Sequence, residues 1–142
     1  MTERKKITIV GAGYVGMSIS AALAVKEDVL ILESNKEKID RINSGKPGIN
    51  DSDINAFFHD QSLSIKATEN KKDAYHEADF IIICVPTDFD EESSSFDTSI
   101  LERVLNDAIT NNSDALVIIR STIPVGYSEQ VRENTKQKTL FF

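Results

Sequence analysis

Short runs of apolar, mostly β-branched residues recur along the chain, and segments with helical spacing separate most of them. Such nearly continuous runs are typical of parallel strands that are buried on both faces. The pattern predicts strands at residues 7–10, 29–32, 63–67, 80–85 and 115–119, and a sixth strand beginning in the closing stretch TLFF.

The segments between these strands carry apolar residues at the spacing of amphipathic helices. We expect helices at residues 17–25, 36–43, 54–59 and 98–109, the last with Asp97 or Thr98 as its N-cap. Alternation of strand and helix predicts an α/β fold of the Rossmann type, a doubly wound parallel sheet with strand order 3-2-1-4-5-6. We expect a single domain that spans residues 1–142.

Charge and composition narrow the choice of partners. The chain has 16 Lys plus Arg against 23 Asp plus Glu, a formal net charge of −7, which disfavours nucleic acid or an anionic membrane. The first apolar run ends at Val10 and is too short for a signal peptide or a membrane span. The single cysteine, Cys84, fits a reducing compartment. We therefore expect a cytoplasmic protein that binds anions through backbone N–H groups.

Three glycines stand directly after the first predicted strand: Gly11, Gly13 and Gly16. This G-x-G-x-x-G pattern is weak alone, but here it lies between a strand and a helix, the context in which it binds a dinucleotide. We expect Gly11 to make the tight turn, Gly13 to let the backbone approach a pyrophosphate, and Gly16 to let the helix pack closely on the strand. The N-terminus of that helix would supply N–H donors and positive potential.

Glu33 ends the second predicted strand, 22 positions after Gly11. A dinucleotide site has a carboxylate about 20 residues after the loop, where it accepts hydrogen bonds from the adenosine ribose. The charge of Glu33 would repel a 2′-phosphate, so we predict NAD rather than NADP, although Lys36 and Lys38 weaken this repulsion. The alternative is a solvated glutamate beside a purely structural turn, and the two features in register favour the NAD site.

Two later strand ends pair a threonine with a proline, in Pro86-Thr87 and in Thr122-Ile123-Pro124. Either motif alone is ordinary turn chemistry. Because ligands bind beyond the carboxyl ends of strands in such sheets, we expect Thr87 and Thr122 together to form a floor for the nicotinamide half. His59 and His76 lack the spacing of metal ligands, so no metal site is expected.

The segments GAGYVGMS, VPTDFDEESSSFDTS and IIRSTIPVG, in this order, resemble the NAD-binding domain of the UDP-glucose/GDP-mannose dehydrogenase family. The resemblance covers essentially the whole chain. The Asp and Phe that follow the Pro-Thr pair, with the later Phe-Asp-Thr, resemble the UDP-glucose type more than the GDP-mannose or N-acetylmannosamine types. The resemblance also implies that Gly11, Gly13, Tyr14, Val15 and Gly16 form a loop that holds the NAD pyrophosphate.

Four further positions receive a role from the resemblance. Glu33 stands where most relatives carry an aspartate, and Lys38 matches a lysine near the adenosine. Thr87 and Thr122 match the threonines of two family motifs. Thr122 would lie close to the reaction centre and is the candidate catalytic residue.

The resemblance further implies oxidation of the C6 alcohol of UDP-glucose to UDP-glucuronate, with two NAD reduced and a thioester formed on a cysteine. Cys84 lies in an apolar predicted strand and is expected to be an inert core thiol. The resemblance implies that the catalytic cysteine, a long central helix and a sugar-binding domain belong to a longer, homodimeric enzyme. The chain alone is expected to bind NAD without turnover.

Three alternatives remain open. A stand-alone NAD-sensing regulatory domain of a potassium transport system would have a similar length and glycine loop, but it would not explain the two threonine motifs. Another nucleotide-sugar dehydrogenase, such as the GDP-mannose type, would share most of the site. A different β-hydroxyacid-type dehydrogenase with the same first domain is the third.

Overall fold

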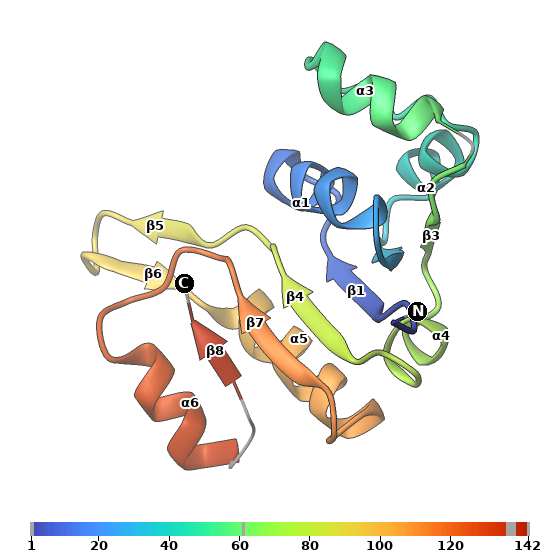
Figure 1. Cartoon of the computed structure of the whole chain (residues 1–142). Coiled ribbons are helices and arrows are strands. Elements are labelled where there is room, and N and C mark those ends of the chain that lie inside the picture. The colour runs from blue at the N-terminus through green and yellow to red at the C-terminus, as the bar shows by residue number, and fades with distance from the viewer. Residues whose placement is uncertain (1, 61, 136–138, 142) are drawn as a thin grey trace.

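The structure is a computed structural model that describes residues 2–60, 62–135 and 139–141, and its main sheet is parallel, with helices on both faces (Figure 1). The sheet order is β3-β2-β1-β4-β7-β8, which is the predicted order 3-2-1-4-5-6 once the separate hairpin strands β5 and β6 are set aside. In chain order the elements are β1 (Lys6–Val10), α1 (Tyr14–Ala24), β2 (Asp28–Leu32), α2 (Lys36–Asn43), α3 (Ser52–His59), β3 (Ile65–Thr68), α4 (Lys71–Tyr75), β4 (Phe80–Ile83), β5 (Asp88–Asp90), β6 (Ser95–Asp97), α5 (Ser99–Asn111), β7 (Leu116–Ile119), α6 (Tyr127–Thr135) and β8 (Thr139–Phe141).

Successive residues of the central strand β1 face two different helical layers. Ile7 and Ile9 belong to a core shared with α1, α2 and α3, whereas Val10 belongs to a core shared with α4, α5 and α6. In the neighbouring strand β4, Ile82 faces the first core and Ile83 the second. Because both faces of the sheet are buried, the strands read as continuous apolar runs, which explains why they could be predicted.

Polar side chains fix α4 and α5 against the sheet. The buried hydroxyl of Thr8 donates a hydrogen bond to the carbonyl of Ala74. At the end of α5 the side-chain amide of Asn112 donates to the carbonyls of Tyr75, at 2.8 Å, and Ala78, at 2.9 Å. These bonds satisfy carbonyls at the end of α4. They also set the positions of the two helices that form one wall of the site.

The third strand begins later than predicted, at Ile65 rather than residue 63, and ends at Thr68. The N–H of Ile65 bonds the carbonyl of Leu63 at 3.1 Å, so the apolar Leu63 lies in a turn before the strand. The outer edge of this strand is covered by Asn43, whose amide pairs with both the N–H (2.8 Å) and the carbonyl (3.0 Å) of Ala67. Such pairing protects a sheet edge from other chains.

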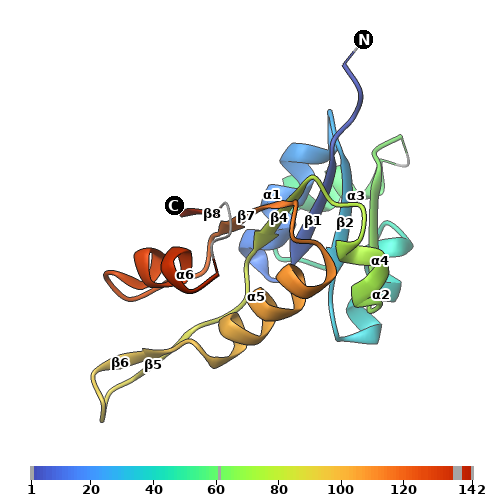
Figure 2. The ribbon, with the colours of Figure 1, turned by 90° about the horizontal axis from the view of Figure 1, so that it is seen from below.

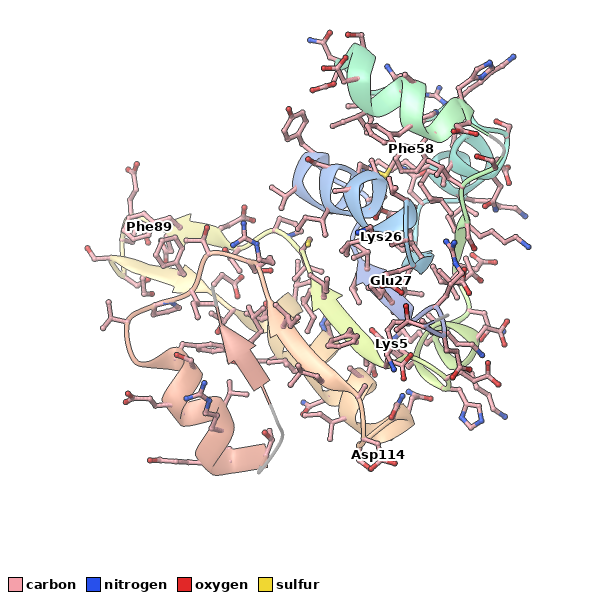
Figure 3. All side chains as sticks on the ribbon, in the orientation of Figure 1. Lys5, Lys26, Glu27, Phe58, Phe89 and Asp114 are labelled. Carbon is pink, nitrogen blue, oxygen red and sulfur yellow. The ribbon has the colours of Figure 1, made fainter. Side chains whose placement is uncertain are left out.

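Three elements were not expected from the sequence: the helices α4 and α6 and the β5–β6 hairpin. The hairpin projects from the body of the domain (Figure 2). Phe89, whose side chain is labelled in Figure 3, stacks edge-on against Phe96 with ring centroids 5.1 Å apart. The acidic and serine-rich residues 91–94 form its turn. The hairpin could not be predicted from an apolar pattern, because its short strands are polar and almost entirely exposed.

Candidate cofactor-binding site

A cavity of about 870 Å³ lies beyond the carboxyl ends of β1, β2, β4 and β7. This volume falls in the range of ligand pockets. The predicted site residues that line it are Gly11, Gly13, Tyr14, Val15, Glu33, Lys38, Thr87 and Thr122. The remaining predicted residue, Gly16, lies beneath the loop and packs against Gly11. The structure therefore brings together groups that are spread over most of the sequence.

Two of the three loop glycines are required by packing. Gly11 has φ +104°, and a Cβ at this position would lie 2.7 Å from the carbonyl oxygen of Cys84. A Cβ on Gly16 would lie 2.1 Å from the carbonyl oxygen of Gly11. Both distances are too short for any side chain, because backbone atoms are on each side. These two glycines thus bring β1, α1 and the end of β4 into close contact.

Gly13 differs from its two neighbours in the loop. It has φ −81° and a Cβ built on it would meet no atom of the described residues within 4 Å. The fold itself therefore has no need of glycine here. Gly13 is the N-cap of α1, where the N–H groups of the first turn point outward and carry the positive end of the helix dipole. Open space at this position fits an anionic group that approaches the backbone closely, as a pyrophosphate does.

Glu33 lies at the end of β2 and holds the loop from the other side. Its Oε2 accepts a hydrogen bond from the N–H of Ala12 at 3.0 Å, and its Oε1 accepts from Ser34 at 2.8 Å and Asn35 at 3.0 Å. Partial burial alone would raise the pKa of Glu33, but these three N–H donors, with Lys38 nearby, outweigh it and lower the pKa. The side chain is therefore a carboxylate at neutral pH.

Tyr14 connects the glycine loop to α3. Its hydroxyl donates to Oδ2 of Asp51 at 3.0 Å, and Asp51 is the N-cap of α3 through bonds from Asp53 and Ile54. The bond to Asp51 raises the pKa of the Tyr14 hydroxyl. Tyr14 as a whole remains 61% exposed, and it lines the cavity. The loop residue is thus anchored at its tip while its ring stays accessible.

The two threonine motifs meet at the other end of the cavity. The hydroxyl of Thr87 donates to the carbonyl of Thr122 at 2.7 Å. The buried Ser121 hydroxyl donates to the carbonyl of Val85 at 2.8 Å. These two bonds join the loop after β4 to the loop after β7. Thr122 itself is exposed and lines the cavity.

Cys84 follows β4 and is half-buried against the apolar core. Burial raises the pKa of its thiol to about 11, although the positive charge of Arg120 opposes the shift. A thiol in this state is protonated at neutral pH and is a weak nucleophile. Both histidines are exposed. Across residues 2–60, 62–135 and 139–141, no group of three or more His, Cys, Asp or Glu could hold a metal ion.

The cavity has a wall that sequence reasoning missed. It is formed by α4 and α5, and its polar residues are Lys71, Tyr75, Arg103 and Asp107. No motif marks these residues, because each is an ordinary helix position until the two helices pack side by side.

Among the described residues, no helix is long and apolar enough to cross a membrane.

A parallel sheet with a glycine turn opening onto a helix N-terminus, and a carboxylate at the end of the next strand, defines a dinucleotide-binding domain of the Rossmann class. The chain belongs to the UDP-glucose/GDP-mannose dehydrogenase family, because residues 5–140 match the NAD-binding domain of that family. The cofactor is therefore NAD. This membership favours the dehydrogenase over the transport-regulator hypothesis.

Several relatives have known names. A UDP-glucose 6-dehydrogenase of Campylobacter jejuni is 41% identical over 140 residues, which cover 96% of this chain and 35% of that protein. The UDP-glucose 6-dehydrogenase of Streptococcus pneumoniae is 33% identical, with the same coverage of both chains. A UDP-N-acetyl-D-mannosamine dehydrogenase of C. jejuni is 31% identical over 92% of this chain and 32% of its own length. The chain spans about a third of the length of these relatives.

Solved structures agree with the fold. The UDP-D-ManNAc dehydrogenase of Pyrococcus horikoshii superposes with a TM-score of 0.84 at 27% identity, over 96% of this chain and 35% of that one. A ternary complex of GDP-mannose dehydrogenase from Pseudomonas aeruginosa gives a TM-score of 0.80 at 26% identity, over 95% and 34%. The Rossmann fold and strand order predicted from the sequence are thereby confirmed.

Proposed function

We propose that this chain is the NAD-binding domain, residues 1–142, of a longer UDP-glucose 6-dehydrogenase that oxidises UDP-glucose to UDP-glucuronate while reducing two NAD. The names of the C. jejuni and S. pneumoniae relatives support the choice of sugar. Relatives named for UDP-N-acetylmannosamine and GDP-mannose make those sugars the competing substrates. We expect the longer enzyme to be a cytoplasmic homodimer.

The observation that carries the proposal is the open space above Gly13 at the N-terminus of α1. In this proposal the N–H groups of Tyr14, Val15 and Gly16, in the first turn, bind the NAD pyrophosphate, and Gly11 makes the turn that presents them. Any side chain at position 13 would fill the space that the phosphate oxygens need.

Glu33 would bind the adenosine ribose. Its Oε1 already accepts two backbone hydrogen bonds, but Oε2 accepts only the one from Ala12 among those that the described residues make. A carboxylate oxygen accepts about two hydrogen bonds, so Oε2 has room for a ribose hydroxyl. Lys38 lines the same end of the cavity and would lie near the adenosine.

At the other end, Thr87 and Thr122 would contact the nicotinamide half. Bound NAD supplies the hydride acceptor. The Thr87 hydroxyl donates a hydrogen bond to the Thr122 carbonyl and so fixes the loop. Thr122 lines the cavity, where its hydroxyl would lie close to the reacting atoms. Cys84 is unsuited to form the thioester because burial raises its pKa. We propose that the catalytic cysteine lies elsewhere in the longer enzyme and that this chain alone turns nothing over.

Calorimetric titration of the 142-residue chain with NAD and with NADP tests the cofactor site. We expect saturable NAD binding, weaker NADP binding, and a loss of about 1–3 kcal/mol of NAD binding free energy in Glu33→Ala. Gly13→Ala is the cleaner probe. In the protein alone its methyl group would occupy open space. In the complex the same space would be needed by the phosphate. The substitution should weaken NAD binding at least about tenfold while changing the free energy of unfolding by about 1 kcal/mol or less.

Glu37→Ala is the matched control for Glu33→Ala and should leave NAD binding unchanged. Glu37 is an exposed glutamate of α2 that pairs with Arg41 and does not line the cavity. Undiminished NAD binding by Gly13→Ala would overturn the proposed site. The sugar is tested with the longest natural protein that contains this sequence, by measuring NADH formation with UDP-glucose, GDP-mannose and UDP-N-acetylmannosamine. Reduction of NAD with either of the last two in preference to UDP-glucose would overturn the substrate assignment.

A further inference from the structure

One wall of the cavity, formed by α4 and α5, contains an ion pair to which the proposed function assigns no role. Nζ of Lys71, the first residue of α4, lies 2.6 Å from Oδ2 of Asp107 on α5. Both residues line the cavity. Their side chains are 61% and 37% exposed, so a ligand in the cavity could reach them. We call these two residues the Lys71–Asp107 pair.

Beside this pair the cavity is apolar. Tyr75 and Leu32 are buried, Val104 is partly buried, and the three side chains belong to one hydrophobic cluster. The ring of Tyr75 is held in place because its own helix is bonded to Asn112. Burial, followed by the negative charge of Asp107, raises the pKa of the Tyr75 hydroxyl, so this residue stays neutral. An apolar surface next to two charged groups suits a flat ring with a polar edge.

The position of Glu33 determines which part of NAD reaches this wall. If Glu33 binds the adenosine ribose and Thr122 lies near the nicotinamide, the adenine extends past Glu33, away from the threonine end. Lys71 begins α4 shortly after β3, the strand next to β2, and the N–H of Glu33 bonds the carbonyl of Thr68 at the end of β3. Lys71 and its partner Asp107 therefore lie on the Glu33 side of the cavity that all three residues line. The edge of adenine presents an amino group, which donates hydrogen bonds, next to ring nitrogens, which accept them.

We propose that the Lys71–Asp107 pair recognises the polar edge of adenine and makes the site selective for this base; the inference rests on the proposed function. Lys71 contacts Oδ2 of Asp107, which leaves Oδ1 able to accept from the adenine amino group. The ammonium of Lys71 donates to the adjacent ring nitrogen. A carboxylate and an ammonium side by side thus match a donor and an acceptor side by side.

The pair would reject a base with the opposite pattern. Hypoxanthine differs from adenine in having a carbonyl oxygen in place of the amino group and a proton on the adjacent ring nitrogen. In the same position, Asp107 would face an acceptor and Lys71 would face a donor. A site whose polar groups lose their partners discriminates more strongly than an apolar pocket does. The pair therefore predicts selectivity for adenine.

Nicotinamide hypoxanthine dinucleotide is the probe that separates this inference from the rest of the site. The 142-residue chain is titrated calorimetrically with NAD and with this analogue. We expect the analogue to bind at least about tenfold more weakly than NAD. Asp107→Asn should reduce this preference to about threefold or less, because an amide can turn its N–H₂ toward a carbonyl. Lys71→Met should weaken the binding of NAD itself, because it removes the ammonium that donates to the adenine ring nitrogen.

Two exposed residues outside the cavity provide matched controls. Lys72→Met changes the next lysine of α4, and Asp114→Asn changes an aspartate at the opposite end of the sheet (Figure 3). Both should keep the preference for NAD. Equal binding of the two dinucleotides by the wild-type chain, or an unchanged preference in Asp107→Asn, would overturn the inference alone. No binding of either dinucleotide would overturn the proposed function and the inference with it.

Discussion

The turn between β1 and α1 and the loops that follow β4 and β7 reach the same cavity, but they are held by different means. In the turn, backbone meets backbone: Gly11 approaches the carbonyl of Cys84, and Gly16 approaches that of Gly11. In the loops, hydroxyl groups of Thr87 and Ser121 span the distance between two chain segments. The glycine side of the cavity therefore depends on the absence of side chains, and the threonine side on their presence.

This difference has an energetic consequence. A methyl group placed where backbone atoms already touch forces a strand or a helix to move, because neither neighbour can rotate away. Loss of a hydroxyl costs only the free energy of its hydrogen bond and the penalty for leaving the partner carbonyl without a donor. Substitutions of the two packing glycines, Gly11 and Gly16, should therefore impair folding, whereas substitutions in the loops should leave a folded domain.

Gly16→Ala should have the largest effect. Its Cβ would lie 2.1 Å from the Gly11 carbonyl, so α1 would have to leave β1. We expect a loss of about 4 kcal/mol or more in the free energy of unfolding, measured by urea denaturation. A mid-helix control, Ser18→Ala, should be close to neutral. A Gly16→Ala protein of wild-type stability would show that the turn has more slack than its contacts indicate.

Gly11→Ala should come next. The position has φ +104°, which L-residues rarely adopt, and its Cβ would lie 2.7 Å from the Cys84 carbonyl. We expect a destabilisation of about 3 kcal/mol in the same assay. A loss equal to or smaller than that of Gly13→Ala would contradict the distinction drawn between packing glycines and the ligand-facing glycine.

Glu33→Gln should destabilise the protein by about 1–2 kcal/mol at neutral pH, because an amide has a single acceptor oxygen. Its N–H₂ group cannot accept a hydrogen bond, so the backbone N–H groups on one side of residue 33 lose their acceptor. The pKa of Glu33 is lowered in the folded state. The stabilisation is therefore present above the unfolded-state pKa and is lost as the pH falls through the lowered folded-state pKa.

Urea denaturation of both proteins from neutral pH down to about pH 3 checks the sign of this effect. The gap between wild type and Glu33→Gln should narrow as the pH decreases. A gap that widens on acidification would mean that the carboxylate is not stabilised by its N–H donors.

Loss of either loop hydroxyl should have the smallest effects, and Ser121→Ala should cost about 1 kcal/mol, since it removes one buried hydrogen bond to the Val85 carbonyl. Thr87→Val, which removes the bond to the less buried Thr122 carbonyl, should cost no more. Thermal unfolding of the two variants measures these losses. Effects as large as that of Gly11→Ala would erase the contrast between the turn and the loops.

Much of the side of the cavity that we propose for adenosine and pyrophosphate could be predicted from the sequence. The glycine spacing, the apolar strand before it and Glu33 about one βαβ unit later are all local features, and the structure places Gly11, Gly13 and Glu33 at one cavity. The threonine motifs were also found, because each directly follows a buried strand. Their direct contact, from the Thr87 hydroxyl to the Thr122 carbonyl, joins loops 35 residues apart and has no local signal.

By itself the sequence determined the order of the buried strands and the side of the sheet on which a ligand binds, since two-sided burial requires apolar runs and a tight turn requires glycine. Only the tertiary structure decided that Lys71 and Asp107 form an ion pair in one wall of the cavity. The residue pattern within α4 or α5 does not predict this pair. Contacts between helices that are distant in the sequence arise from packing on a common sheet, not from the local sequence of either helix.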